Sequence, residues 1–320
     1  MQVGFKLATE GHDPKEIIEL GVHAERAGFD FVELSDHYHP WLEEQGHSGF
    51  TWTMLGSLAA RTERLGLATG VTCPIIRYHP AVVAQAAATT ALLSDGRFTL
   101  GIGAGERLNE HVVGGGWPAV SVRHAMLVEA LEIIHRLFEG GYQSYEGRYL
   151  TLEDARVFDL PKEPVPLAVA AGGPRAARLA ADKGDGLFVT EPDPDLLATF
   201  REAGGTGPSY AEVPLAFGTT EDEAAQEAHR TSRWTLSGWK VMAELPNPVN
   251  FDAASGTVTL DDIKGQFSCG PDVERHVEQA RPFAEAGYDH LVLMDVGPDP
   301  HAFLDFAADG LIDRVRALGG

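Results

Sequence analysis

The 320-residue sequence predicts a closed (β/α)8 TIM barrel formed by a single domain over residues 1–320. Three observations support this fold class. Short apolar segments recur along the chain, an amphipathic helical pattern follows most of them, and eight such segments can be counted. Most of the segments are apolar almost throughout, as expected for parallel strands that are buried on both faces. A doubly wound open sheet is the alternative arrangement of the same units.

The predicted strands share short length, many Val, Ile, Leu, Ala or Phe residues, and a polar or glycine-containing stretch after them. They cover residues 3–7, 29–34, 65–71, 98–102, 166–170, 186–190, 213–217 and 290–294. Two longer segments, about 141–165 and 236–268, interrupt the regular alternation of strand and helix. We expect both to be insertions into the barrel.

Start and stop signals mark the helices between these strands. Asp13 is a predicted N-cap, Pro14 a first helical residue, Glu16 the partner in a capping box, and Gly28 the end of the helix. Similar signals predict a helix from His79-Pro80 to about 95–96, one over 121–138, one from Gly173-Pro174 to Gly184, a capping box at Thr220 and Glu223, and helices that begin at Asp272 and His301. Pro282 is expected to kink or break the helix that begins at Asp272.

The composition restricts the classes of partner. The formal net charge is −22 and the acidic residues are spread along the chain, which argues against binding to nucleic acid or to an anionic membrane. No apolar run reaches the ~20 residues of a membrane span, and the N-terminus lacks the pattern of a secretory signal. Cys73 and Cys269 fit no metal or redox spacing, so we expect reduced thiols in a cytoplasmic protein.

The candidate functional residues follow the strand ends, where a barrel enzyme places its active site. Asp36, His37 and Trp41 follow the second predicted strand, and Glu106 and Asn109 follow the fourth. Further candidates follow the first, third and fifth strands: Glu10, the turn Gly70-Val71-Thr72, and Ala171-Gly172-Gly173. The sequence therefore predicts that a histidine, carboxylates, a tryptophan and a glycine-rich helix start converge at one end of the barrel.

Simpler explanations exist for several of these features. Asp36-His37 could be a local turn, Trp41 a cover over the barrel mouth, and Gly172-Gly173-Pro174 a plain turn before a helix rather than a phosphate seat. A metal site at His37, His39 and His47 is disfavoured because their spacing has no matching partner elsewhere.

Two further motifs favour structural roles. Gly101, Gly103 and Gly105 lack the spacing of a dinucleotide fingerprint, so we expect them to let a flat ring approach the backbone. Cys73 is interpreted as a small buried side chain and not as a nucleophile.

Five segments, taken in order, resemble the F420-dependent branch of the luciferase-like superfamily. They are SDHYHPW (35–41), ATGVTCPIIRYHPAVVAQA (68–86), GIGAGERLNE (101–110), WPAV (117–120) and AVAAGGP (168–174). The similarity covers nearly the whole chain and is densest between residues 1 and 190. Within this branch the chain resembles the F420-dependent secondary alcohol dehydrogenases and glucose-6-phosphate dehydrogenases. The SDHYHPW segment, the TCPIIRYHPA string and Cys269 resemble the alcohol dehydrogenases more closely.

The resemblance implies roles for the strand-end residues. His37 matches the family's catalytic histidine, Trp41 its substrate-side tryptophan, Glu106 its catalytic glutamate, and Glu10 a further active-site carboxylate. Positions that hold the deazaflavin ring of coenzyme F420 are matched by Asp36, Asn109, Gly70, Val71 and Thr72, and those that hold its phosphate by Ala171, Gly172 and Gly173. The resemblance also implies a non-prolyl cis peptide between Gly70 and Val71, no metal, and a homodimer.

The resemblance leads to a hypothesis about the reaction. A hydride would pass from a small alcohol, either a secondary alcohol or an unphosphorylated sugar, to F420. His37 would take the alcohol proton, because a histidine with a pKa near neutrality suits that task. Positions where the glucose-6-phosphate enzymes carry cations match Asp193, Ala253 and Gln266 here, which disfavours a sugar phosphate. Asp193 is also a predicted helix N-cap before Pro194.

Four alternatives remain open at this point. They are a dehydrogenase acting on glucose 6-phosphate, a monooxygenase that uses FMN, a reductase that uses reduced F420 on a carbonyl substrate, and a barrel that binds a cofactor without catalysis. The cofactor that the protein binds and the substrate that it turns over would separate them.

Overall fold

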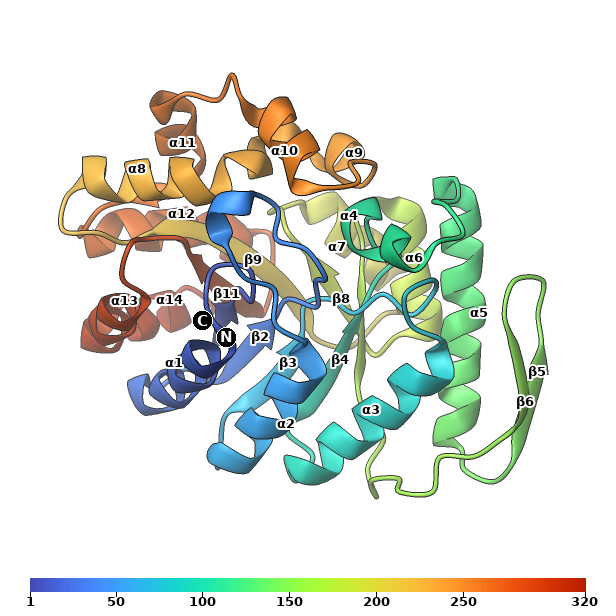
Figure 1. Ribbon diagram of the computed structural model, residues 1–320. Coiled ribbons are helices and arrows are strands. Elements are labelled where there is room, and N and C mark those ends of the chain that lie inside the picture. The colour runs from blue at the N-terminus through green and yellow to red at the C-terminus, as the bar shows by residue number, and fades with distance from the viewer.

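Eight parallel strands form a closed barrel in the computed structural model, which describes residues 1–320 (Figure 1). The strands are β1 (Gln2–Leu7), β2 (Phe31–Leu34), β3 (Gly66–Thr69), β4 (Phe98–Ile102), β7 (Leu167–Ala170), β8 (Gly186–Val189), β9 (Ser209–Ala216) and β11 (His290–Asp295). They pair in this order, and β11 pairs with β1 to close the ring. The TIM-barrel prediction and its eight strand positions are confirmed, and the open sheet is wrong.

The helices that cover the barrel begin largely where the sequence signals place them. They are α1 (Pro14–Ala27), α2 (Thr51–Arg61), α3 (Pro80–Leu93), α4 (Arg107–Glu110), α5 (Val120–Phe138), α6 (Pro174–Lys183), α7 (Pro194–Glu202), α8 (Glu221–Ser232), α12 (Val273–Glu285), α13 (Pro300–Phe306) and α14 (Ile312–Ala317). Asp193 caps α7 by accepting hydrogen bonds from two backbone N–H groups of its first turn, as predicted. The chain contains no helix long and apolar enough to cross a membrane.

Neither predicted capping box forms, because the side chain of Glu16 or Glu223 does not accept a hydrogen bond from the backbone N–H of its N-cap residue. Asp13 caps α1 as expected, but the carboxylate of Glu16 lies 3.3 Å from Nδ1 of His12 and accepts no hydrogen bond from the backbone of Asp13. At α8, Thr220 accepts a bond from the N–H of Glu223, whereas the carboxylate of Glu223 accepts one from the N–H of Thr219. A nearer polar partner has replaced the cap backbone in each case.

The last two predicted helices differ from expectation in detail. Helix α12 is capped by Asp272 and continues through Pro282 to Glu285, so the break predicted there is wrong. Pro282 lies in the final turn, and the buried side chain of Phe283 keeps this end of the helix packed on the core. Helix α13 begins at Pro300 with Asp299 as its N-cap, one residue before the predicted start.

The two irregular segments add structure outside the barrel. Strands β5 (Gln143–Glu146) and β6 (Thr151–Ala155) form an antiparallel hairpin beside α5, at the right of Figure 1. Residues 236–268 contain α9 (Trp239–Met242), α10 (Pro248–Ser255) and α11 (Leu260–Gln266), and a 3-10 turn, η3 (Arg233–Ser237), precedes them. A short strand, β10 (Ser268–Cys269), then pairs with β9.

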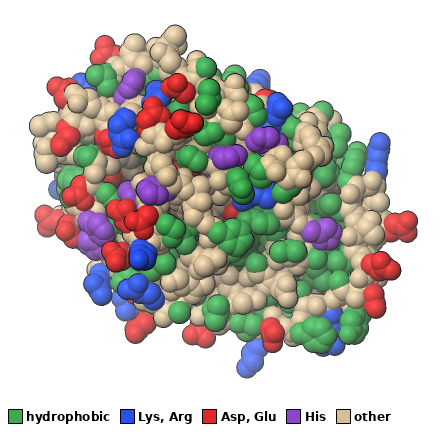
Figure 2. All heavy atoms as spheres, viewed as in Figure 1, with side chains coloured by type: hydrophobic (Ala, Val, Ile, Leu, Met, Phe, Trp, Pro, Cys, Tyr) green, Lys and Arg blue, Asp and Glu red, His purple; other side chains and the backbone are tan.

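Buried apolar side chains form one large core, a second cluster between β9, α8 and α11, and a smaller cluster at the barrel mouth. The large core joins the strands to the surrounding helices. The smaller cluster contains Trp41, Leu42, Leu108, Met242 and Phe251, so it connects the loops after β2 and β4 with α9 and α10. Figure 2 shows acidic side chains spread around the margin of one face, in keeping with their even distribution in the sequence.

Candidate active site

The predicted residues at the ends of β1, β2 and β4 come together around His37. Nδ1 of His37 forms an ion pair with Oε1 of Glu10, and Nε2 lies 3.6 Å from Oε1 of Glu106. The ring of Trp41 stands edge-on to the imidazole at a centroid distance of 4.9 Å and an angle of 81°. Only 10% of the His37 side chain is exposed. One titratable ring therefore lies between two carboxylates with an aromatic wall beside it.

The carboxylates change the protonation behaviour of this histidine. Burial disfavours the charged imidazole, but Glu10 and then Glu106 outweigh burial and raise the pKa of His37 above its ordinary value of 6.5. Burial also opposes ionisation of Glu10, yet His37 and Lys6 hold the pKa of that carboxyl below its usual range. Glu10 and His37 therefore each favour the charged form of the other.

An aromatic wall extends from Trp41 into the second insertion. Trp234 stacks on Trp41 with centroids 4.0 Å apart and planes 11° from parallel. Phe251 meets the same ring edge-on at 5.1 Å. Trp234 and Phe251 were not predicted as site residues, because only the fold of residues 233–255 over the barrel mouth brings them to Trp41. Phe251 is fully buried and Trp41 is only 6% exposed, so this packing fixes the Trp41 ring beside His37.

Asn109 connects the loops after β2 and β4. Its side-chain oxygen accepts hydrogen bonds from the backbone N–H groups of Tyr38 at 2.7 Å and His39 at 3.0 Å. Its amide nitrogen donates to Oε1 of Glu106 at 2.5 Å. Asn109 therefore fixes the position of Glu106 relative to the segment that carries His37.

Asp36 is held by three neighbours that sequence reasoning did not single out for this role. Its carboxylate accepts hydrogen bonds from the hydroxyl of Thr72 at 2.7 Å, the hydroxyl of Tyr78 at 3.1 Å and the guanidinium of Arg77 at 3.1 Å. Arg77 also donates to the carbonyl of Asp36 and pairs with Glu110. Burial, only partly opposed by Arg77, raises the pKa of Glu110 to about 7. A buried network thus fixes the segment before His37.

The turn after β3 has the conformation that the resemblance implied. The peptide between Gly70 and Val71 is cis, which confirms that expectation. The glycines at the end of β4 serve protein packing: a Cβ on Gly101, within the strand, would lie 1.8 Å from the carbonyl oxygen of Thr69, and one on Gly103 would lie 2.8 Å from the side chain of Val71. These glycines therefore make room for the neighbouring residues Thr69 and Val71, and not for the bound ring that was expected from the sequence.

The glycine-rich segment after β7 presents free backbone donors. The backbone N–H groups of Gly172, Gly173 and Arg175 at the start of α6 donate to no protein acceptor, and all three residues are at least partly exposed. Ala171 is tied to β8 through a bond from its N–H to Phe188. Free N–H groups at the first turn of a ten-residue helix can bind an anion.

The remaining sequence candidates lie outside this cluster. No group of histidines, cysteines or carboxylates has the arrangement of a metal site, so the disfavoured His37, His39 and His47 set is not formed. Nδ1 of His39 is hydrogen-bonded to the carbonyl of Leu108. Cys73 is buried and free, and burial raises the pKa of its thiol, which is consistent with a structural residue.

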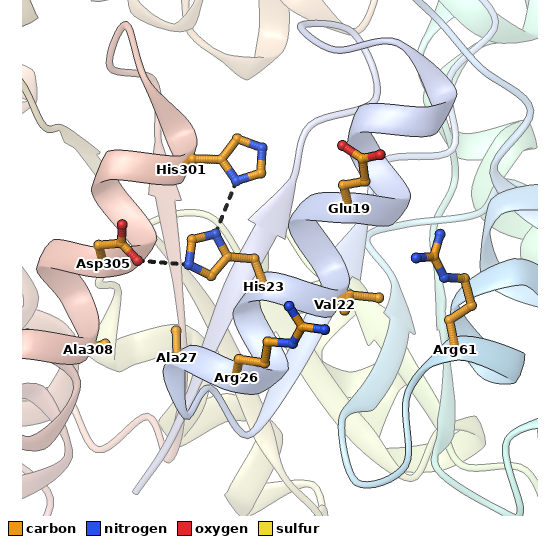
Figure 3. Close-up of a pocket in the computed structure, with 9 residues that line it drawn as sticks. All are labelled: Glu19, Val22, His23, Arg26, Ala27, Arg61, His301, Asp305 and Ala308. Atoms are coloured by element: carbon orange, nitrogen blue, oxygen red, sulfur yellow. Dashed lines mark hydrogen bonds and ion pairs between the residues drawn. The ribbon is translucent and has the colours of Figure 1, made fainter.

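A second group of histidines lines a groove outside the barrel, between α1, α2 and α13 (Figure 3). His23 stacks on His301, their Nδ1 atoms share a 3.0 Å hydrogen bond, and Nε2 of His23 is bonded to Asp305 at 2.8 Å. Arg26 and Arg61 line the same groove. All these residues lie on helices, so the groove is separate from the site at the strand ends.

A parallel barrel with a buried histidine–carboxylate pair at its strand ends defines the chain as a TIM-barrel enzyme. Residues 1–255 match the family model described as luciferase-like monooxygenase, and the chain belongs to this luciferase-like family, as its motifs suggested. It is 34% identical over 333 residues to the F420-dependent glucose-6-phosphate dehydrogenase of Nocardia farcinica (strain IFM 10152), with 99% of each chain covered.

Two further comparisons agree with this family. The F420-dependent glucose-6-phosphate dehydrogenase of Beutenbergia cavernae (strain ATCC BAA-8) is 35% identical over 331 residues, which cover 99% of this chain and 98% of the relative. A solved structure of an F420-dependent secondary alcohol dehydrogenase in complex with an F420-acetone adduct has a TM-score of 0.91 and 31% identity, covering 98% of this chain and 99% of that chain.

Proposed function

We propose that this chain is an F420-dependent dehydrogenase that transfers a hydride between a small alcohol and coenzyme F420. The observation that carries the proposal is the Glu10–His37–Glu106 cluster beside the aromatic wall of Trp41. This arrangement offers a base for an alcohol proton and an apolar surface for the carbon skeleton. The full-length similarity to F420-dependent dehydrogenases supports the choice of cofactor.

The residues present fit this coenzyme at two places. The turn Gly70–Thr72 and Asn109 would hold the flat ring, and Asp36 would act through its bond to Thr72. The free amides of Gly172 and Gly173 at the start of α6 would hold the phosphate, with Ala171 fixing the strand end before them. When bound, F420 supplies the acceptor or donor of the hydride.

His37 would exchange the proton of the substrate oxygen. In alcohol oxidation its neutral ring accepts the hydroxyl proton, and in carbonyl reduction its charged ring returns one. Glu10 orients the ring through Nδ1 and stabilises the charged form. Glu106, fixed by Asn109, lies on the Nε2 side and would exchange a proton with the cofactor ring. Trp41 would pack on the substrate and exclude water from it.

The site favours a secondary alcohol or an unphosphorylated sugar over a sugar phosphate. The wall formed by Trp41, Trp234 and Phe251 is aromatic. Asp193 is engaged as the N-cap of α7, and Ala253 and Gln266 are exposed neutral residues, so none of the three supplies a cation for a phosphate. Oxidation of glucose 6-phosphate is the second candidate, because the curated relatives carry that activity in their names.

We also propose a homodimer that buries the outer face of α3. This helix carries large apolar side chains on its exposed face as well as on its buried face, and Val82, Leu92 and Leu93 are 56%, 42% and 53% exposed on it. A helix that is hydrophobic all round is normally covered on both faces. Since one face already packs on the barrel, a second copy of the chain would cover the other.

The deciding experiment mixes the purified protein with oxidised F420 and follows the loss of its fluorescence. Short secondary alcohols, unphosphorylated sugars and glucose 6-phosphate are compared as hydride donors. Loss of fluorescence with secondary alcohols or sugars supports the proposal, and loss with glucose 6-phosphate alone replaces it by the second candidate. Tight binding of FMN without binding of F420 would refute it.

A further inference from the structure

Three ionisable side chains form a cluster inside the barrel, directly below the site. Nζ of Lys6 on β1 donates to Oε1 of Glu33 on β2 at 2.5 Å and to Oε1 of Glu212 on β9 at 2.5 Å. Its third proton goes to the carbonyl of Gly70 at 2.8 Å. The side chains of Lys6 and Glu33 are only 7% and 1% exposed. All three donors of the ammonium group are therefore used, and one of them holds the turn after β3.

Glu33 supports the same turn from below. A Cβ placed on Gly70 would lie 1.9 Å from Oε1 of Glu33, so the carboxylate lies directly against the backbone of Gly70. Oε2 of Glu33 is buried without a hydrogen-bond partner. Lys6 and Glu33 are also opposite each other in the register of β1 and β2. Both Lys6 and Glu33 therefore contact the backbone of Gly70 at the start of the turn.

Stability alone does not account for this cluster. The interior of a TIM barrel is normally filled by branched apolar side chains. A buried ion pair is often no more stable than well-packed apolar residues of similar volume, because desolvation offsets the attraction between the charges. The cluster also reaches beyond its own contacts, since the positive charge of Lys6 lowers the pKa of Glu10 and opposes the rise in the pKa of His37.

We propose that Lys6, held by Glu33 and Glu212, is a positioning residue that fixes the Gly70–Thr72 turn for the cofactor ring and places a positive charge beneath the Glu10–His37 pair. The proposal rests on the proposed function for its cofactor part only. Its electrostatic part concerns the protein alone, so the two parts can be tested apart.

The test compares Lys6→Met with the wild-type protein in two measurements. In the protein without cofactor, NMR of histidines labelled at Cε1 follows the titration of His37, assigned by its loss in His37→Gln. Loss of the positive charge is expected to move the His37 titration to higher pH. Fluorescence titration with F420 is expected to show binding weakened by about tenfold, the value of one hydrogen bond from a charged donor.

A control and a second variant keep the test decisive. Arg97→Met removes another part-buried cation that bonds to backbone carbonyls, at the start of β4, and is expected to lower stability without moving the His37 titration. If Lys6→Met does not fold, Lys6→Gln, which keeps hydrogen-bond donors but not the charge, is measured in its place. An unmoved His37 titration together with wild-type F420 affinity overturns the proposal. Absence of F420 binding by the wild-type protein overturns the proposed function instead, and the NMR result still decides the electrostatic part.

Discussion

Replacing Glu33 by glutamine should make the protein more stable, and increasingly so as the pH rises. Burial, reinforced by Glu212 and only partly opposed by Lys6, raises the pKa of Glu33 from 4.5 to about 8 in the folded protein. In the unfolded chain the carboxyl ionises at its ordinary pKa. Between these values the folded state binds the extra proton, so its stability falls with increasing pH until the folded pKa is passed.

The size of the effect follows from the two pKa values. Each unit of difference corresponds to about 1.4 kcal/mol, so the full interval from 4.5 to about 8 costs the wild-type protein up to roughly 5 kcal/mol. Between about pH 5.5 and pH 7.5 the cost should grow by about 2–3 kcal/mol. Glutamine cannot ionise, and its amide oxygen can still accept the bond from Lys6, so the variant escapes this loss.

Urea unfolding across this pH range measures the difference directly. The free energy of unfolding of Glu33→Gln minus that of the wild type should increase with pH. Glu63→Gln, at an exposed position in the loop between α2 and β3, serves as the control. Its free energy of unfolding should change with pH in the same way as that of the wild type. A difference for Glu33→Gln that stays constant from pH 5.5 to 7.5 would refute the assignment of a raised pKa to this carboxyl.

Four further predictions concern the site and the assembly. His37→Ala should lower kcat by about 10²–10⁴ with F420 affinity retained, and near-normal turnover in steady-state assays would contradict its role. Glu10→Gln removes the charge that raises the pKa of His37, so the rise of kcat/KM for alcohol oxidation with pH should move to lower pH; an unchanged profile argues against the pair. Trp41→Leu should raise KM for the alcohol more than it lowers kcat, whereas an equal KM would show that the ring does not contact substrate. Leu93→Asp on α3 should convert a dimer to a monomer, as measured by light scattering. Asp195→Asn, at the exposed start of α7, is the control and should leave the dimer intact. A monomeric wild-type protein would exclude the dimer.

The fold was predictable because its signals are local. Each strand has its own apolar segment, and helix starts such as Asp13-Pro14 and His79-Pro80 depend on neighbouring residues only. The strand-end rule then brought Glu10, His37 and Glu106 together without knowledge of any long-range contact. The capping-box pattern did not predict the partners of Glu16 and Glu223 correctly, because several polar groups within the same turn compete for each carboxylate.

The supporting residues were not predictable for the opposite reason. Lys6 and Glu212 are 206 positions apart, and only the register of the closed barrel makes their charges meet. Phe251 belongs to the second insertion and Trp234 lies just before it, and the path of this segment over the barrel mouth has no periodic pattern in the sequence. Arg77 gave a weak signal, since a lone arginine in an otherwise apolar stretch before His79-Pro80 needs an acidic partner when buried.

The protonation state of His37 connects this geometry to the direction of the reaction. Because Glu10 and Glu106 raise its pKa above 6.5, the ring is charged over more of the neutral range than an ordinary histidine. A charged ring can give a proton to a carbonyl oxygen at once, whereas alcohol oxidation first requires that the ring lose its proton. Carbonyl reduction should therefore be fastest below the pKa of His37, and alcohol oxidation should accelerate as the pH rises through it. Lys6 opposes this rise in the pKa of His37, so the buried cluster and the Glu10–His37 ion pair together set how the rate of each direction depends on pH.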